Sequence, residues 1–461
     1  MTASGAMTAA DLSEPALGVA GTAAPPAGPR WRAVPVANLR QVGCSLADQV
    51  FSVGGMFAVN IALARVRPRE DYGLFALSYS LFTFLAGLHN AAILEAYTVY
   101  GSGRYRGRFA RYETFAARHN GWLLAGLTLV LVTIWQGLRW LRPAFASPAL
   151  LGMALSSGVL LNAAFRRRTF YIRQRPDLAA RFSTVFLLTC LVLLGLALWA
   201  GLLNGLSAFL IAAAAWSAAF LFMLPRRNEN ETAPLARAPD FLAEEPGYWL
   251  EHWRYSRWVF VTALVFQFTT QAYFWLVAAL LSVRAVAGLR ALYNLALPVD
   301  QVFAAVSLLL IPQMAGRYAA GELGQLRRLW RQCLTGYLGL SLTFALVAGV
   351  ASLPLLHLVY GGKFDDLAPL LRWYVLAPVA MGAGHAANAA LKAMERPQAV
   401  LAAYVGSGVV TFAAGIPLVA RLGLRGAVYG ILLSAAAYAA LLGFLFRRTG
   451  SPAAAAAEPA P

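Results

Sequence analysis

Charged residues are scarce in this sequence. Only 13% of its 461 residues are Asp, Glu, Lys or Arg, and lysine occurs only at Lys363 and Lys392. Soluble domains carry about 25% charged residues. Hydrophobic residues make up 59% of the chain, and the mean hydropathy is +0.60. This composition excludes an ordinary soluble domain and predicts a membrane protein with several spans.

Cysteine is scarce as well, and recognisable catalytic motifs are missing. Cys44, Cys190 and Cys333 are odd in number and lack metal-ligand spacing. The segment Gly361-Gly-Lys363-Phe lacks the earlier glycine and the hydroxyl of a phosphate-binding loop. Zinc spacing and a nucleophile elbow are also absent from the sequence. We therefore expect no enzyme activity, no metal and no cofactor, and any energy that the protein uses should come from an ion gradient, the membrane potential or the supply and removal of a substrate.

Acidic residues are few relative to basic ones. The chain has 20 Asp and Glu against 38 Lys and Arg, a net charge of +18. An excess of this size can indicate nucleic-acid binding. Here the arginines lie in short connectors between apolar runs, where membrane topology requires them. We therefore expect no nucleic-acid partner.

Twelve apolar runs have the length of about 20 residues that a bilayer core of about 30 Å requires. They are residues 44–65, 72–99, 121–141, 147–170, 180–200, 203–225, 256–282, 286–314, 334–360, 366–391, 397–420 and 424–446. Basic residues concentrate in the connectors on the side of the N-terminus, which predicts that both termini are cytoplasmic. The opposite connectors are too short for an extracytoplasmic catalytic domain.

The runs divide the chain into two lobes. Residues 41–225 and 256–447 contain six spans each. Residues 1–40 and 448–461 predict disordered cytoplasmic tails. Residues 226–255 predict a cytoplasmic linker with an interfacial helix, because residues 248–258 mix Trp, Tyr and Arg. The alternative is an ordinary aromatic anchor for the seventh span.

Short matches between the two lobes indicate an internal repeat. The matching pairs are Gly73-Leu-Phe-Ala-Leu77 with Gly288-Leu-Arg-Ala-Leu292, Gly121-Trp-Leu-Leu with Gly336-Tyr-Leu-Gly, and Arg175-Pro176 with Arg396-Pro397. Because each unit has an even number of spans, both copies enter the membrane from the same side. The sequence predicts an all-α polytopic membrane protein with about twelve transmembrane helices in two parallel six-helix repeats, an arrangement typical of transporters.

Two short motifs resemble a known family. They are Phe51-x-x-Gly54-x-x-Phe57-x-x-Asn60 and Asp71-Tyr-Gly-x-Phe75, and the repeated Arg-Pro accompanies them. The chain resembles the polysaccharide (O-antigen/exopolysaccharide) flippase family of the multidrug/oligosaccharidyl-lipid/polysaccharide exporter superfamily. It shows fewer helices than the fourteen usual for lipid II flippases, and no pattern diagnostic of drug extruders.

The resemblance implies a transporter of the bacterial inner membrane. Its substrate would be undecaprenyl-diphosphate-linked oligosaccharide, flipped by alternating access to the periplasmic leaflet through a cavity lined by the first, second, seventh and eighth helices. Membrane lipid and other polysaccharide assembly proteins are the implied partners. Two alternatives are a cation-coupled multidrug or small-molecule extruder of the same superfamily and a membrane polysaccharide polymerase or ligase.

Polar residues in the seventh and eighth runs are the first candidates for a transport site. Asp300 lies near the middle of its run, two residues after Pro298, and an ionisable residue at membrane depth is a functional candidate. Gln267 and Gln271 are four residues apart and therefore share one helix face. The pattern predicts one polar cavity wall. Alternatively, Asp300 satisfies backbone groups freed by Pro298 or pairs with glutamine.

The first lobe has four further candidates. His89, Asn90 and Glu95 lie in the second run, and Asp48 lies in the first. Positions 89 and 95 are about 240° apart around a helix, so only one can face a cavity. We expect Glu95 to form an interfacial ion pair with the arginines at 104–111. Asp48 either faces the cavity or interacts with a helix dipole.

The diphosphate of the implied substrate would require cations. The candidates are Arg166, Arg167, Arg168 and Lys392 near the inner surface, and Arg290 and Arg372 about one turn from the outer surface. The alternative is that these residues follow the positive-inside rule or extend to the interface. His385 and Asn388 lie among Gly and Ala and predict close helix packing.

Overall fold

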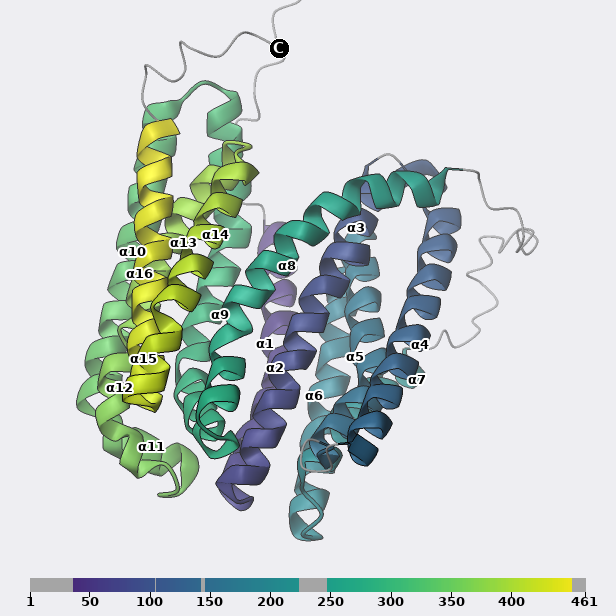
Figure 1. Ribbon diagram of the computed structural model, residues 1–461. Helices are drawn as coiled ribbons and strands as arrows, with labels where there is room; N and C mark the ends of the chain where they lie inside the picture. The colour runs from purple at the N-terminus through teal and green to yellow at the C-terminus, as the bar shows by residue number, and fades with distance from the viewer. Residues whose placement is uncertain (1–35, 104, 142–145, 224–246, 450–461) are drawn as a thin grey trace, which may run out of the picture.

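The computed structural model describes residues 36–103, 105–141, 146–223 and 247–449. Every regular element in these ranges is helical (Figure 1). Eleven helical segments within them are long and apolar enough to cross a membrane. The predicted all-α polytopic class is confirmed. Residues 1–35 and 450–461 of the predicted tails, and residues 224–246 at the predicted linker, lie outside the described ranges.

The helices form two groups, which we call the N-lobe and the C-lobe. The N-lobe comprises α1 (Val36–Val66), α2 (Arg69–His89), η1 (Asn90–Leu94), α3 (Glu95–Ser102), η2 (Arg106–Arg108), α4 (Phe109–Leu141), α5 (Pro148–Ile172), α6 (Pro176–Trp199) and α7 (Gly205–Phe222). The C-lobe comprises α8 (Tyr248–Leu280), α9 (Val283–Ala319), α10 (Leu323–Val350), α11 (Ser352–Tyr360), η5 (Asp365–Leu367), α12 (Ala368–Tyr374), α13 (Ala377–Ala393), α14 (Pro397–Ala413), α15 (Gly415–Leu422) and α16 (Leu424–Thr449).

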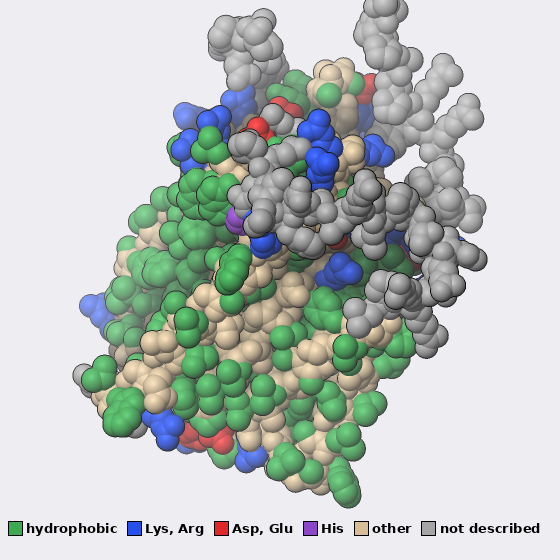
Figure 2. Space-filling model, turned by 90° about the vertical axis from the view of Figure 1, so that its right-hand side faces the viewer, with side chains coloured by type: hydrophobic (Ala, Val, Ile, Leu, Met, Phe, Trp, Pro, Cys, Tyr) green, Lys and Arg blue, Asp and Glu red, His purple; other side chains and the backbone are tan. Residues whose placement is uncertain are grey.

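These helices follow the predicted apolar runs in order. The eighth run is α9, which is not among the eleven segments and carries Arg290, Asn294, Asp300 and Gln301 along its length. Hydrophobic side chains cover much of the face shown in Figure 2, and basic side chains gather toward its upper end. That distribution fits a protein whose lateral surface contacts lipid.

Proline and a polar cap explain where several helices begin. Pro148, Pro176 and Pro397 are the first residues of α5, α6 and α14. Proline lacks a backbone N–H, but the N–H at the first position of a helix has no acceptor within the helix, so nothing is lost there. The Ser147 side chain accepts a hydrogen bond of 3.2 Å from the Leu150 amide and caps α5.

Three of the predicted runs are broken into shorter helices. α10 ends before α11, α12 before α13, and α14 before α15. Pro378 lies just after the second break and Pro417 just after the third. Proline has no backbone N–H to donate to the preceding helical turn, so the helix is interrupted before it. In the N-lobe, the π-helical turn η1 interrupts the second run between α2 and α3. Hydropathy alone does not reveal these interruptions.

The internal repeat extends to the backbone conformation. Gln174 and Glu395 have positive φ values of 58° and 57°, and no other non-glycine residue in the described ranges does. Each directly precedes one of the repeated Arg-Pro pairs, Arg175-Pro176 and Arg396-Pro397. The two lobes therefore make the same left-handed turn at equivalent places.

The repeated helices α2 and α9 pack against each other between the lobes. A Cβ atom at Gly73 of α2 would lie 2.0 Å from the Val283 carbonyl oxygen, so only glycine permits this approach. Further along, Asn294 Nδ2 donates hydrogen bonds of 2.9 Å to Asn60 Oδ1 and to Tyr72 Oη. Tyr72 Oη itself lies 2.6 Å from Asn60 Oδ1. A buried polar network thus joins the lobes.

A second set of contacts joins the lobes at the end where α1 and α2 meet. Lys363 Nζ donates to the carbonyl oxygens of Arg65 (2.9 Å) and Arg67 (2.6 Å). Arg65 Nε donates to the Val359 carbonyl oxygen at 2.7 Å, and Arg69 forms an ion pair with Asp366. Burial and the neighbouring Arg69 charge lower the pKa of Lys363. We call these contacts the outer latch, because the predicted topology places them on the extracytoplasmic side.

The region predicted as an interfacial helix is part of a longer helix. α8 is continuous over 33 residues from Tyr248 and includes the aromatic residues 248–258. In Figure 1 its first half extends over one end of the N-lobe before the helix turns down beside α9. Residues 248–280 contain no Gly or Pro that would separate an interfacial helix from the span.

Candidate functional site

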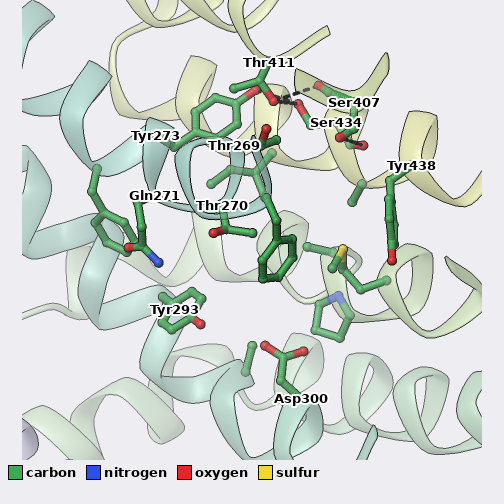
Figure 3. Close-up of a pocket in the computed structure, with 18 of the residues that line it drawn as sticks. Thr269, Thr270, Gln271, Tyr273, Tyr293, Asp300, Ser407, Thr411, Ser434 and Tyr438 are labelled. Atoms are coloured by element: carbon green, nitrogen blue, oxygen red, sulfur yellow. Dashed lines mark hydrogen bonds between the residues drawn. The ribbon is translucent and has the colours of Figure 1, made fainter. Parts of the chain in front are cut away.

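The C-lobe contains a cavity of about 300 Å³ between its helices. α8 contributes Thr269, Thr270 and Gln271, and α9 contributes Tyr293 and Asp300 (Figure 3). α14 and α16 complete the opposite wall. Aromatic rings and hydroxyl groups dominate the lining, which is typical of a small-molecule pocket with a few orienting polar groups.

Asp300 is the acidic residue of this cavity. Its carboxylate points into the space bounded by Tyr293 and the α8 residues in Figure 3. Among the described residues, it forms no hydrogen bond or ion pair. A carboxylate among aromatic rings and without an internal cation offers a site for an external cation.

A hydroxyl network forms the wall opposite Asp300. Tyr273 Oη lies 3.0 Å from Ser434 Oγ, and Thr411 Oγ1 lies 2.9 Å from the same atom. Ser407 Oγ donates a 3.0 Å hydrogen bond to the Ser434 carbonyl oxygen. These bonds join α8, α14 and α16 and fix the shape of the cavity (Figure 3).

The two predicted glutamines do not share the cavity wall. Gln271 is buried and lines the cavity, as Thr269 and Thr270 do. Gln267 instead packs against Gly87 of α2, where an added Cβ would lie 1.9 Å from Gln267 Nε2. The two residues are one helical turn apart on α8, as their spacing predicts. Gln271 reaches the C-lobe cavity, whereas Gln267 reaches the contact between the lobes.

Asp48 does not face a cavity. It is fully buried and accepts hydrogen bonds from Arg167 Nε (2.9 Å), Arg167 Nη2 (2.7 Å) and Tyr171 Oη (2.7 Å). Ser183 Oγ donates to it as well. Asp48 was predicted either to face the cavity or to interact with a helix dipole, and instead it forms a buried ion pair with Arg167. Arg167, a predicted diphosphate ligand, is therefore already paired with an acid.

His89 and Asn90 are also held inside the N-lobe. His89 is buried, with Nε2 2.7 Å from Asn120 Oδ1. Asn90 Oδ1 accepts a 3.1 Å hydrogen bond from Arg168 Nη2. Neither lines the C-lobe cavity. Both residues flank the junction of α2 with the π-helical turn.

Glu95 differs from its expected role. In the part of the chain that the structure describes, it forms no ion pair with the arginines of 104–111. The cations whose charges reach it are Lys392 of α13 and Arg168 of α5. Glu95 opens α3, which packs against α8 of the C-lobe, so this helix lies on the side of the N-lobe that faces the C-lobe. Helix rotation, which sequence spacing leaves open, decides this orientation.

Arg290 is the most deeply buried of the predicted diphosphate ligands. It is 4% exposed, and its guanidinium lies over the rings of Tyr79 (4.5 Å), Tyr293 (5.1 Å) and Phe274 (5.8 Å). No acidic residue pairs with it within the described ranges. Tyr79 belongs to the N-lobe, so this cation–π contact also joins the lobes.

The remaining predicted cations are at helix ends or on the surface. Arg166 is 3.7 Å from Glu113, and Arg372 Nε donates to Ser352 Oγ at 3.2 Å. Lys392 is exposed in the last turn of α13. The structure does not bring Arg166, Arg290, Arg372 and Lys392 together into one anion site.

An apolar groove of about 440 Å³ lies between α1 and α9. α1 contributes Val50, Val53 and Phe57 to it, and α9 contributes Leu297 and Val302. Unlike the C-lobe cavity, this groove lies between the two lobes. It has the lining expected for a hydrocarbon chain.

Several cavity residues were not singled out by the sequence. Tyr404, Ser407 and Thr411 are spaced three and four residues apart on α14, a pattern that could have indicated one polar face. His385, expected only at a packing contact, also lines the cavity. Within the described ranges, no group of three His, Cys, Asp or Glu residues could hold a metal ion.

Solved structures of membrane transporters share this fold. An inward-facing multidrug resistance MATE family transporter of the MOP superfamily matches with a TM-score of 0.72 and 13% identity, covering 89% of this chain and 96% of that chain. An outward-facing multidrug resistance MATE transporter matches with a TM-score of 0.62 and 12% identity over 89% and 95%. A MOP superfamily transporter from Pyrococcus furiosus gives 0.62 and 13% over 90% and 95%.

These similarities identify a MATE-like fold. No protein-family model and no curated protein sequence matches the chain. At 12–13% identity the likeness establishes the fold, and the activity has to be argued from the site.

Proposed function

We propose that this protein is a membrane transporter of the MOP superfamily that exports small organic cations by alternating access. The observation that carries the proposal is the unpaired Asp300 carboxylate in the aromatic cavity of the C-lobe. The fold likeness to multidrug MATE transporters supports it. Of the functions considered from the sequence, this is the cation-coupled extruder.

The cavity chemistry suits an amphipathic cation. Tyr293, Tyr374 and Phe274 supply ring faces, and Asp300 supplies the negative charge. A volume of about 300 Å³ is at the lower end of the range for small-molecule sites. Hydroxyl groups on the opposite wall orient polar substituents.

Competition for Asp300 provides the coupling in this proposal. A proton or a monovalent cation that enters from outside neutralises Asp300 and displaces the organic cation. The N-lobe offers no equivalent at Asp48, because the Arg167 guanidinium already neutralises that carboxylate. The coupling ion and the substrate therefore use the same acid at different stages of the cycle.

Flipping of undecaprenyl-diphosphate-linked oligosaccharide is the second candidate. The apolar groove between α1 and α9 favours it, because a polyprenyl chain could occupy the groove while the head group lies between the lobes. Under this proposal the protein acts in the bacterial inner membrane with both termini cytoplasmic. Membrane lipid and polysaccharide assembly proteins are then its partners.

Transport assays separate the two candidates. Inverted membrane vesicles that contain the full chain should accumulate ethidium when a proton or sodium gradient is applied. Asp300→Asn should lower the initial rate at least about tenfold, because it removes a charged contact worth roughly 1.5–3 kcal/mol. Asp177→Asn is the matched control, since Asp177 pairs with Arg175 at the helix start.

The outcome decides between organic cations and lipid-linked sugar. Full ethidium transport by Asp300→Asn would contradict the role of the carboxylate. If wild-type vesicles move lipid-linked oligosaccharide and leave ethidium outside, flipping replaces cation export as the function.

A further inference from the structure

α8 is longer than a membrane span requires. Its 33 residues extend about 50 Å at 1.5 Å per residue, whereas a bilayer core is about 30 Å thick. The surplus of roughly 13 residues corresponds to its N-terminal part, which extends over the end of the N-lobe in Figure 1. In a chain that spans a bilayer, this geometry would place the N-terminal part of α8 at the level of the lipid headgroups.

One face of this segment is anchored to the N-lobe. Tyr248, His252 and Ser256 are buried and recur every four residues, one helical turn apart. His252 Nε2 donates to the Ala92 carbonyl oxygen at 3.0 Å, and its Nδ1 lies 3.1 Å from Tyr112 Oη. Ala92 belongs to the π-helical turn η1, so α8 caps an irregular part of the N-lobe.

The acidic residue of the segment also faces the N-lobe. Glu251 is the only Asp or Glu among residues 248–258. Its carboxylate accepts a hydrogen bond from Tyr105 Oη, and its carbonyl oxygen lies 3.3 Å from Tyr100 Oη. The opposite face consequently carries positive charge alone.

That opposite face combines exposed indole rings with arginines. Trp249, Trp253 and Trp258 are 51%, 44% and 68% exposed. Arg254 and Arg257 are exposed between them, and within the described ranges neither pairs with an acid. We call Trp249, Leu250, Trp253, Arg254, Arg257 and Trp258 the headgroup face.

We propose that the headgroup face binds anionic phospholipids of the inner leaflet. Indole rings prefer the membrane interface, and each nearby arginine attracts an anionic surface by about 1 kcal/mol. A zwitterionic lipid also has a phosphate, but its own ammonium group cancels that charge, so only an anionic lipid offers net negative charge to the two guanidinium groups. Charge complementarity therefore selects an anionic headgroup.

The bound lipid acts on the same helix that forms the cavity wall. Trp258 and Thr269 are 11 residues apart on α8, which is about three turns. Anionic lipid fixes the position of the N-terminal part of α8 against the N-lobe and thereby the position of its cavity-lining residues. This inference concerns the lipid contact and does not depend on which substrate the cavity transports.

Lipid retention tests the inference directly. The full chain is placed in nanodiscs of equal phosphatidylglycerol and phosphatidylcholine and then purified. It should retain phosphatidylglycerol preferentially. Mass spectrometry of the bound lipids measures this preference. Arg254→Gln with Arg257→Gln should reduce this preference at least about fivefold. Raising the salt concentration should weaken the wild-type preference, because exposed charges are screened.

A matched variant controls for general loss of charge. Arg327 and Arg328 are exposed at the start of α10, at the same end of the molecule as the start of α8 (Figure 1). Arg327→Gln with Arg328→Gln should leave the preference unchanged, and both double variants should keep the wild-type melting temperature. Equal retention of the two lipids by wild-type protein, or equal losses in both double variants, would overturn the proposal.

Discussion

At the scale of single residues, Asp48 and Asp300 show how differently two buried acids can be used. Both lie in predicted spans, and sequence reasoning made both candidates for a transport role. Asp48 is saturated by Arg167, Tyr171 and Ser183, whereas Asp300 faces an aromatic cavity. The first arrangement stabilises the N-lobe, and the second leaves a charge available to a ligand.

The Asp48 ion pair predicts a stability effect. Arg167→Met should lower the free energy of unfolding by about 3–5 kcal/mol, because it leaves a buried carboxylate without its cation. Asp300→Asn should change stability little, since no described residue pairs with Asp300. Thermal unfolding in one detergent measures both variants. A larger loss of stability for Asp300→Asn than for Arg167→Met would contradict this assignment of roles.

At the scale of elements, the two Arg-Pro turns link the repeat to backbone geometry. Gln174 and Glu395 adopt left-handed φ, which is unfavourable for residues with a Cβ atom. Matching sequence motifs showed that the lobes are related. The left-handed turn itself was not predicted, because neither position has the glycine or asparagine that usually marks such a conformation.

This geometry predicts an unusual order of substitutions at Gln174. Gln174→Val should destabilise the protein by about 1–2 kcal/mol relative to Gln174→Gly, because a β-branched residue is strained at positive φ. The order should reverse at exposed Gln332 in the middle of α10, where glycine costs helix stability. Melting temperatures of the four variants test this, and Gln174→Val as stable as Gln174→Gly would refute it.

At the scale of the whole molecule, contacts between the lobes hold one end of the molecule closed. The outer latch joins residues 65–69 to residues 359–366, and Asn60, Tyr72 and Asn294 form a buried layer near it. These contacts hold the lobes together at the end that the predicted topology places on the extracytoplasmic side. The latch is polar and partly exposed, so each of its contacts contributes little and can exchange.

Weakening the outer latch should favour the outward-open state. Asp366→Asn removes the ion pair with Arg69, worth up to about 1 kcal/mol, and should raise outward opening by up to roughly fivefold. Ser80→Cys, buried beside Trp275 at the lobe contact, can report opening in a chain whose native cysteines are replaced. The measurement is labelling by an impermeant thiol reagent added outside.

A neighbouring acid provides the control for the latch. Asp365 lies 2.8 Å from His357 within the C-lobe, so Asp365→Asn alters no ion pair between the lobes. When Asp365→Asn is introduced into the Ser80→Cys protein, the rate of thiol labelling should equal that of the Ser80→Cys protein itself. Similar rates for Asp366→Asn and Asp365→Asn would show that the ion pair does not hold the lobes together.

The sequence by itself determined the membrane class, the positions of the spans and the duplicated plan. Each depends on local hydropathy, on the length needed to cross a bilayer, or on short matches within the chain. Asp300 and Gln271 could also be singled out, because a polar side chain at membrane depth is costly wherever it points. Whether Asp48, Glu95 or Gln267 would face a cavity could not be read from the same signals.

Only the tertiary structure decided which polar groups found partners. Helix rotation and packing bring Arg167 to Asp48 across 119 positions of sequence, and Arg69 to Asp366 across 297. They also place the cavity in the C-lobe and direct Gln267 toward Gly87 of the other lobe. Such pairings depend on contacts between distant segments, for which hydropathy and spacing carry no information.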